Sequence, residues 1–134
     1  MKKILFCLFI LASLSGCAHD LGHRFAPTAP QGNMALIYYY RPSNFFGSGV
    51  SYDIKENGQS VVSLYNGGYY PHLTFAGYKT ITAWTTTVSF YAESGKTYFI
   101  RGKEHMGLIL YHPAIKLVPE EKALREIQMC RLIK

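Results

Sequence analysis

The chain has 134 residues, a length that suits one domain with a modest hydrophobic core. Its 14 basic and 8 acidic residues give a net charge of +6 and a pI of about 9.3. This basic balance could indicate a nucleic-acid partner, but the export signal at the start of the chain excludes that class.

The first residues have the three parts of a secretory signal. Lys2 and Lys3 give a positive start, an uncharged apolar run covers residues 4–12, and small residues follow up to Gly16. The apolar run is shorter than the ~20 residues that a membrane-spanning helix needs. We therefore expect residues 1–16 to be a signal peptide rather than a transmembrane segment.

Residues 14–17, Leu-Ser-Gly-Cys, resemble the lipobox of bacterial lipoproteins. The resemblance implies cleavage before Cys17, a diacylglycerol on its thiol and often a further acyl chain on the new amino terminus. A single acyl chain binds a membrane only marginally, at about 0.8 kcal/mol per buried CH₂, which favours more than one chain. Ala18 stands where aspartate would favour the inner membrane, so the resemblance implies an outer-membrane protein facing the periplasm. An ordinary secretory signal is the alternative.

The mature chain divides into a tether and one domain. Removal of residues 1–16 leaves 118 residues, with 12 basic against 8 acidic side chains and hence a charge of +4. Residues 17–33 contain Pro27, Pro30 and Gly32 without a sustained period, which predicts a flexible tether of up to roughly 50 Å. We expect residues 34–134 to form a single β-sandwich domain. Its mild positive charge suits anionic lipid or glycan, or a surface without any electrostatic partner.

The first half of the domain has a strong strand pattern. Residues 34–40 are apolar or aromatic throughout, which predicts a strand covered on both faces. Residues 50–55 alternate between apolar and polar, as in a half-buried strand. Asn57 and Gly58 form a strong hairpin signal, and residues 61–65 return as the partner strand.

The second half continues in short strands separated by turns. Residues 69–75 form a candidate strand in which Pro71 indicates an edge or a bulge. Further candidates cover residues 78–84, 88–92, 97–101, 106–111 and 114–118. Turns recur about every ten residues, so we predict an all-β fold, an antiparallel β-sandwich of about seven to nine short strands with a short C-terminal helix.

The C-terminal helix begins at Pro119, with Glu120 and Glu121 at the positive end of its dipole. Four residues share one helical face: Ala123, Leu124, Ile127 and Cys130. Because Cys7 leaves with the signal and Cys17 is alkylated, only Cys130 keeps a free thiol and no intramolecular disulfide can form. Its place on the packed face predicts a buried thiol.

Several turns and strand starts together resemble a family of small bacterial lipoproteins that carry a domain of unknown function, related to PEGA-like β-sandwich domains. The resemblance covers roughly residues 34–131 and implies a β-sandwich in the cell envelope, with no reaction. The chain departs from the PEGA-like pattern at Ala76-Gly77, where that pattern has Pro-Gly. The segments that carry the resemblance are residues 40–42, 57–58, 77–80 and 93–99, with the acidic helix and Cys130.

The chain shows no catalytic constellation, metal site or cofactor motif. His19 and His23 have the spacing of two ligands on a helix, but Gly22 lies between them and no third ligand is placed by the sequence. No histidine is placed beside Cys130 to act as a base, and the thiol is expected to be buried. We therefore predict no catalytic residues, no metal and no cofactor.

Aromatic residues are the one compositional excess, with 11 Tyr, 8 Phe and 1 Trp. Exposed rings could anchor a protein partner or stack on sugars, whereas buried rings would fill the sandwich core. Phe45 and Phe46 lie in a glycine-flanked loop, where exposure and burial are equally expected. The candidate partner-binding residues are Phe45, Phe46, Tyr69, Tyr70 and Trp84.

We therefore expect a non-enzymatic envelope lipoprotein, held to a membrane through lipid on Cys17. Its sandwich would be a protein-interaction module that binds an envelope protein through strand edges or an aromatic patch. The first alternative is a module that binds peptidoglycan or another cell-wall glycan. A hydrolase that uses Cys130 or a histidine is the third reading.

Overall fold

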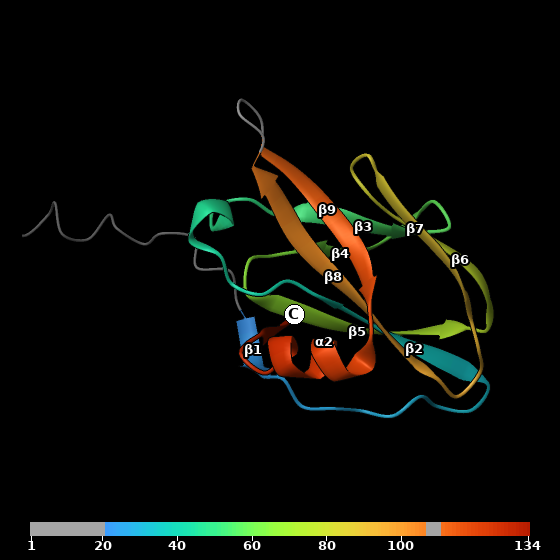
Figure 1. Ribbon diagram of the computed structural model, residues 1–134. Helices are drawn as coiled ribbons and strands as arrows, with labels where there is room; N and C mark the ends of the chain where they lie inside the picture. Colours follow the sequence, from blue (N-terminus) through green and yellow to red (C-terminus); the bar gives the residue numbers. More distant parts are fainter. Residues whose placement is uncertain (1–20, 107–110) are drawn as a thin grey trace, which may run out of the picture.

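The computed structural model describes residues 21–106 and 111–134 of the chain. The predicted signal peptide and Cys17 lie outside the described residues. Two β-sheets pack face to face, and one short helix covers the outer face of the larger sheet (Figure 1). The predicted all-β sandwich with a short C-terminal helix is thus confirmed.

The strands fall into a six-stranded and a four-stranded sheet. The larger sheet has the spatial order β1 (Leu21–Arg24), β10 (Arg131–Ile133), β5 (Gly68–Phe75), β2 (Met34–Tyr40), β8 (Thr97–Met106) and β9 (Tyr111–Val118). The smaller sheet has the order β4 (Gln59–Leu64), β3 (Tyr52–Glu56), β6 (Gly77–Ala83) and β7 (Thr86–Ala92). Two pairs, β2 with β8 and β10 with β5, are parallel, and the other pairs are antiparallel. The smaller sheet packs on one face of the larger, and helix α2 (Glu120–Ile127) packs on the other.

Strand β2 lies at the centre of the molecule and is buried on both faces, as its continuous apolar sequence predicts. Ile37 and Tyr39 point into the core between the sheets. Leu36, Tyr38 and Tyr40 point into a second core beneath α2. The strand therefore divides the interior into two apolar layers.

The turns follow the local chemistry of their residues. Asn57 and Gly58 join β3 to β4 with φ angles of 48° and 84°, as a two-residue hairpin loop with positive φ at both positions requires. Pro71 lies in β5 beyond the reach of β10, whose pairing ends at Tyr69. Pro71 therefore occupies a local sheet edge, as predicted, where no neighbouring strand needs its missing N–H.

The predicted tether over residues 17–33 is wrong from Leu21 onward. Strand β1 pairs with β10 at the edge of the larger sheet. The Phe25 ring lies 5.3 Å from the rings of both Tyr38 and Tyr69, and the backbone N–H of Thr28 donates to the Tyr38 hydroxyl at 2.7 Å. Periodicity missed this segment because its strand has four residues and its partner strand lies at the other end of the chain. The folded domain therefore includes the residues from Leu21 onward and not only those from residue 34.

The helix is shorter than its apolar stripe predicts. It ends at Ile127, and Cys130 follows it, just before β10. Cys130 is nevertheless buried in the core beneath the helix, together with Ala123 and Ile127. The predicted burial of the thiol is confirmed, although the residue that carries it is not helical.

Candidate functional site

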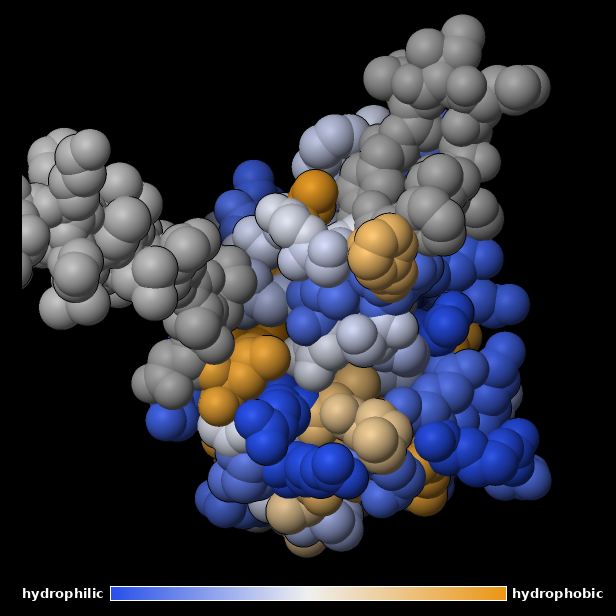
Figure 2. All heavy atoms as spheres, turned by 90° about the vertical axis from the view of Figure 1, so that its left-hand side faces the viewer, coloured by the Kyte–Doolittle hydropathy of each residue, from blue (hydrophilic) through white to orange (hydrophobic). Residues whose placement is uncertain are grey.

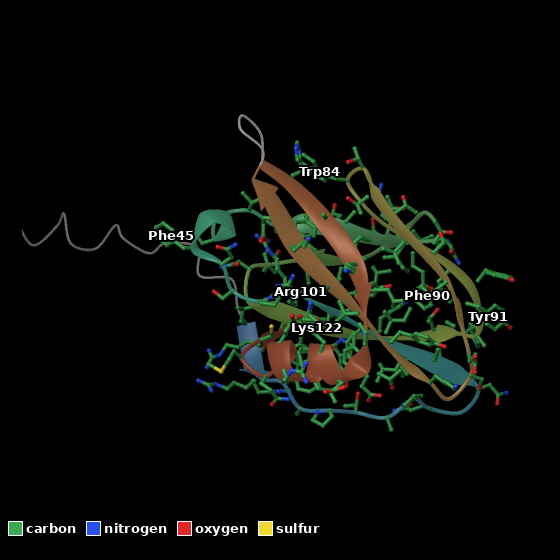
Figure 3. All side chains as sticks on the ribbon, viewed as in Figure 1. Phe45, Trp84, Phe90, Tyr91, Arg101 and Lys122 are labelled. Carbon is green, nitrogen blue, oxygen red and sulfur yellow. The ribbon has the colours of Figure 1, made fainter. Side chains whose placement is uncertain are left out.

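The five predicted binding residues do not form one surface. Phe45 and Trp84 are 85% and 62% exposed, and Figure 3 shows them on different sides of the molecule, Phe45 at the left and Trp84 at the top. Tyr69 is only 1% exposed, so its predicted role in binding a partner is wrong. It packs in the core beneath α2, while the next residue, Tyr70, is half-buried on the opposite face of β5. The side chain of Phe46 lies outside what the structure describes.

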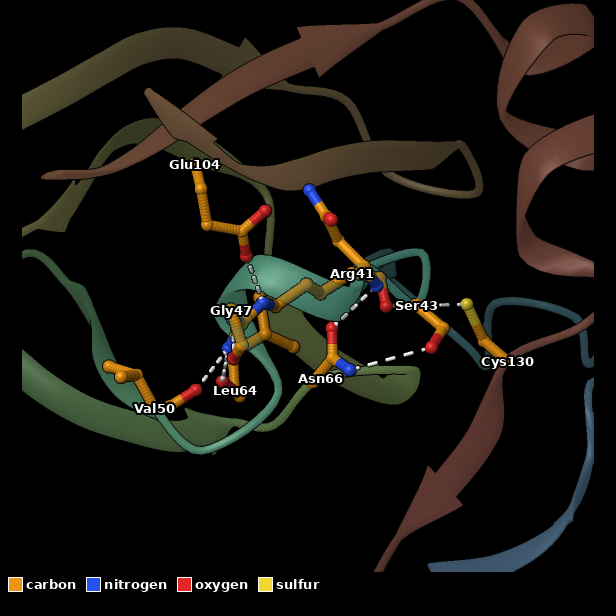
Figure 4. A network of polar contacts seen from close by, with 9 residues as sticks. Arg41, Ser43, Gly47, Val50, Leu64, Asn66, Glu104 and Cys130 are labelled. Atoms are coloured by element: carbon orange, nitrogen blue, oxygen red, sulfur yellow. Dashed lines mark hydrogen bonds and ion pairs between the residues drawn. The ribbon is translucent and has the colours of Figure 1, made fainter. Parts of the chain in front are cut away.

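Phe45 begins a single turn of 3₁₀-helix, Phe45–Gly47, in the loop between β2 and β3. A fully buried arginine, Arg41, holds this loop from below (Figure 4). Its Nη2 donates to the carbonyl oxygen of Gly47 at 2.7 Å, its Nη1 donates to the carbonyl oxygens of Val50 and Leu64, and its Nε pairs with the Glu104 carboxylate. One guanidinium thus fixes the end of the 3₁₀ turn and the start of β3.

Two further features rigidify this loop. The Asn66 side chain accepts from the backbone N–H of Asn44 at 2.8 Å and donates to the Ser43 hydroxyl at 3.4 Å. A Cβ added to Gly47 would lie 2.6 Å from Nη2 of Arg41, so only glycine fits against the guanidinium. Because a charged donor with several acceptors is held in a low-dielectric interior, the backbone of the loop that carries Phe45 is held in place.

A second exposed surface lies on the outer side of the four-stranded sheet. Lys79, Ile81 and Ala83 of β6 point inward, so the alternating residues of the strand point outward. The outward residues of β6 and their cross-strand partners on β7 form what we call the β6–β7 face: Tyr78, Thr80, Thr82, Thr87, Ser89 and Tyr91.

Tyr78 and Tyr91 are 82% and 52% exposed, and they lie opposite each other on the β6–β7 face. Their ring centroids are 5.0 Å apart with an interplanar angle of 84°, an edge-to-face pair. The sheet register fixes this pair without any contribution from a loop. Neither residue was among the predicted binding residues, although Tyr78 is in phase with the outward-pointing Thr80 and Thr82.

Trp84 continues the β6–β7 face at its other end, in the two-residue loop that joins these strands. Its φ angle is 52°, a backbone conformation that residues other than glycine, asparagine or aspartate rarely adopt. The indole borders an open hollow of about 240 Å³ that is also lined by Asp53, Lys55 and Thr82. An aromatic ring thus stands beside a carboxylate, an ammonium group and a hydroxyl.

A second buried charge cluster lies behind the β6–β7 face. The Glu56 carboxylate accepts from the Thr74 hydroxyl at 2.6 Å and from Lys79 Nζ at 3.1 Å, and its other oxygen lies 3.3 Å from Nε2 of His72. Burial alone would raise the pKa of Glu56, but hydrogen bonds from these three residues outweigh it and lower the pKa to about 2. Glu56 therefore ties β3 of the smaller sheet to β5 of the larger one.

Burial raises the pKa of the Cys130 thiol to about 11. The S–H group donates to the carbonyl oxygen of Arg41 at 3.7 Å. Because the thiolate is the nucleophilic form, the thiol is a weak nucleophile at neutral pH. In the described part of the chain no three metal-ligating side chains come together. His19, which has the ligand spacing to His23, lies outside that part. His23 is exposed and its Nδ1 lies 2.7 Å from the carbonyl oxygen of Arg24.

The buried charged residues Arg41, Glu104 and Glu56 were not predicted from the sequence either. Each belongs to a run in which a charged residue normally reads as exposed, and each is buried because the fold brings together partners distant in sequence. Arg41 and Glu104 are 63 residues apart, and Glu56 and Lys79 are 23 apart. Only for Arg41 did the local sequence hint at burial, because this residue directly follows an apolar strand and precedes Pro42.

Comparisons of the chain with protein-family models, curated proteins and solved structures found no match. The resemblance to PEGA-like lipoproteins therefore stays a prediction. Among the described residues, no helix has the length and apolar character needed to cross a membrane.

Proposed function

We propose that the protein is a lipid-anchored envelope lipoprotein whose sandwich is a non-enzymatic protein-interaction module, with the β6–β7 face as its binding surface. The observation that carries this proposal is the exposed edge-to-face pair of Tyr78 and Tyr91, held by sheet register on a face that Trp84 extends. The anchor is the lipid on Cys17, and the site of action is the periplasmic side of the outer membrane.

The chemistry of the β6–β7 face suits a protein partner. Tyrosine and tryptophan dominate the energetics of protein interfaces because each buries a large area and fixes few rotatable bonds. The hydroxyl groups of Thr80, Thr82 and Ser89 lie between the tyrosine pair and Trp84, where they can bond the polar groups of a partner backbone. Strain at Trp84 supports the same reading, because side chains kept in rare backbone conformations concentrate at functional sites.

Site-specific photo-crosslinking in cells tests the proposal. A photoreactive amino acid at Thr80, in the middle of the β6–β7 face, should capture one dominant envelope protein. The same amino acid at Glu121, an exposed position on α2, should not. Replacement of both rings, Tyr78→Ser with Tyr91→Ser, should abolish the capture at Thr80. Equal capture from both positions, or none from Thr80, would contradict the proposal.

The anchor has its own test. Cys17→Ser should abolish labelling of the protein by fatty acids and release it from membranes, whereas Cys130→Ser should leave both unchanged. Persistent labelling of the Cys17→Ser variant would exclude Cys17 as the lipid site. Fractionation of inner from outer membranes then decides the location.

A glycan is the second candidate ligand, and the hollow beside Trp84 favours it. An indole face flanked by Asp53, Lys55 and Thr82 combines a stacking surface with donors and acceptors for sugar hydroxyls. In that case the protein should sediment with purified cell-wall sacculi, and Trp84→Ala should abolish sedimentation while Tyr91→Ala should not. A protein-binding module should remain in the supernatant.

A further inference from the structure

Exposed basic residues gather around β1 and β10, at the end of the sandwich where the described chain begins. Arg24 and Arg131 lie directly opposite each other in the β1–β10 pair, and both are exposed. Lys134 is exposed beyond β10, and its side chain lies beside Gly22 of β1. No described carboxylate forms an ion pair with Arg24 or Arg131. Three basic side chains therefore lie along one edge of the larger sheet.

Two exposed apolar side chains accompany these charges. Met129 is 69% exposed, and its sulfur lies 3.8 Å from Nη1 of Arg24. Phe45 lies at the same end of the molecule (Figure 3). Its loop contacts the turn before β5 through Asn66, and the carbonyl oxygen of Gly67 in that turn accepts from the N–H of Arg131.

Figure 2 views this end of the molecule and shows apolar side chains set among strongly hydrophilic ones. We call the surface formed by Arg24, Phe45, Met129, Arg131 and Lys134 the β1 end.

The start of β1 limits how far this end can lie from the anchor. Four residue steps separate Cys17 from Leu21, and a fully extended chain covers at most about 14 Å in four steps. The tether expected from sequence alone would have allowed roughly 50 Å. A lipid on Cys17 would thus hold β1 at the bilayer surface, whatever path residues 18–20 take.

From the short linker and the composition of this surface we infer that the β1 end is a membrane-contact surface for anionic phospholipid. Its three basic side chains face the lipid phosphates, while Phe45 and Met129 enter the boundary between headgroups and acyl chains. The inference rests on the lipid anchor of the proposed function for its biological setting. Basic side chains attract anionic headgroups, and exposed aromatic or long apolar side chains bury part of their surface in the same layer. The Arg41 network supports this role because it fixes the backbone of the loop from which the exposed Phe45 projects.

Flotation of the chain from residue 17 with vesicles tests the inference. The variant Cys17→Ser serves as the starting protein, so that no acyl chain contributes to binding. It should bind vesicles of phosphatidylethanolamine and phosphatidylglycerol in equal parts more tightly than vesicles of phosphatidylcholine. A basic residue near an anionic surface contributes about fivefold in affinity. The triple change Arg24→Gln, Arg131→Gln and Lys134→Gln should therefore lower binding at least about tenfold.

A matched control removes the same charge elsewhere. Lys96, Lys116 and Lys122 are exposed and lie away from the β1 end, so their replacement by glutamine should lower binding much less. The pair Phe45→Ser and Met129→Ser should weaken binding without removing the preference for anionic vesicles. Equal losses in both triple variants, or no preference for phosphatidylglycerol, would overturn the inference. Fatty-acid labelling of Cys17 reports separately on the lipid anchor. Failure of the proposed anchor is therefore distinguishable from failure of the proposed membrane-contact surface.

Discussion

Two regions of the sandwich, the β1 end and the β6–β7 face, are each supported from inside by an ion pair, but the pairs support different kinds of surface. At the β1 end, Arg41 and Glu104 are buried, and the guanidinium fixes an irregular loop that presents Phe45. Behind the β6–β7 face, Glu56 pairs with Lys79 within the smaller sheet, and both bond Thr74 of the larger one. The exposed rings of this face depend on strand pairing.

The difference shows how a small sandwich can keep exposed aromatic residues ordered. A ring on a strand inherits its direction from the pleat, so Tyr78 and Tyr91 need no polar network of their own. A ring on a loop has no such support, and Phe45 depends on a charge that is costly to bury and more costly to leave unpaired. Loss of the Arg41–Glu104 pair should therefore disturb the Phe45 loop more than loss of the Glu56–Lys79 pair disturbs the tyrosine pair.

The largest expected effect comes from Glu104→Gln, which leaves the buried guanidinium of Arg41 without its counter-ion. We expect the free energy of unfolding to fall by about 3 kcal/mol, as for other broken buried pairs. Urea denaturation measures this loss. The control Glu121→Gln removes the exposed pair with Arg125 and should change stability by less than about 0.5 kcal/mol. Equal losses of stability in the two variants would contradict the stabilising role of the buried Arg41–Glu104 pair.

The next effect is a dependence of stability on pH that arises from Glu56, behind the β6–β7 face. The pKa of Glu56 is about 2 in the folded protein, below the value of 4.5 that an unperturbed glutamate has. A depressed pKa contributes stability above pH 4.5 that disappears as the pH falls towards 2. Allowing for partial solvent exposure, we expect the carboxylate to contribute about 2 kcal/mol. Glu56→Gln should therefore be less stable than the wild type at neutral pH.

Denaturation from pH 6 down to pH 2 checks this window, with wild type and variant measured side by side. The stability difference between them should shrink as the pH falls, because only the wild type loses the Glu56 contribution. Glu93→Gln, at a half-exposed surface pair with Lys96, should not change the pH profile. A constant difference between Glu56→Gln and wild type would contradict the assignment.

The smallest expected effect concerns the strained backbone at Trp84. Because its φ is 52°, we expect Trp84→Gly to be more stable than Trp84→Ala by about 1 kcal/mol. At Thr80, in regular strand geometry, the order should reverse, since glycine weakens a strand by about 0.5–1 kcal/mol relative to alanine. Thermal unfolding of the four variants tests both orders. The same order at both positions would show that the conformation at Trp84 carries no strain.

Much of the fold could be predicted because its signals are local. The continuous apolar run of β2 predicted a strand buried on both faces, and Asn57 with Gly58 predicted its hairpin. The strands missed were β1 and β10, which are short and pair with each other across almost the whole chain. No window of sequence contains both, so periodicity assigned the first to a tether and overlooked the second.

The surfaces were less predictable than the strands. Tyr69 and Tyr70 looked alike in sequence, but β5 lies between two cores and buries one ring on each side. Phe45 was predicted as a possible binding residue because it lies in a glycine-flanked loop. Trp84 was expected at the end of a strand over residues 78–84, but it lies in the loop after β6, where it is exposed. The ion pairs behind these surfaces were not predicted, because Arg41 meets Glu104, and Glu56 meets Lys79, only after the sheets have formed.

The central claim is that the β1 end faces the membrane while the β6–β7 face points away from it. The single tryptophan, Trp84, makes fluorescence quenching by brominated lipids the most direct test. The lipidated protein is placed in bilayers with brominated acyl chains and compared with a variant that carries Phe45→Trp and Trp84→Tyr. We expect strong quenching of the variant and none of the wild type. Quenching of the wild type equal to or greater than that of the variant would contradict the account.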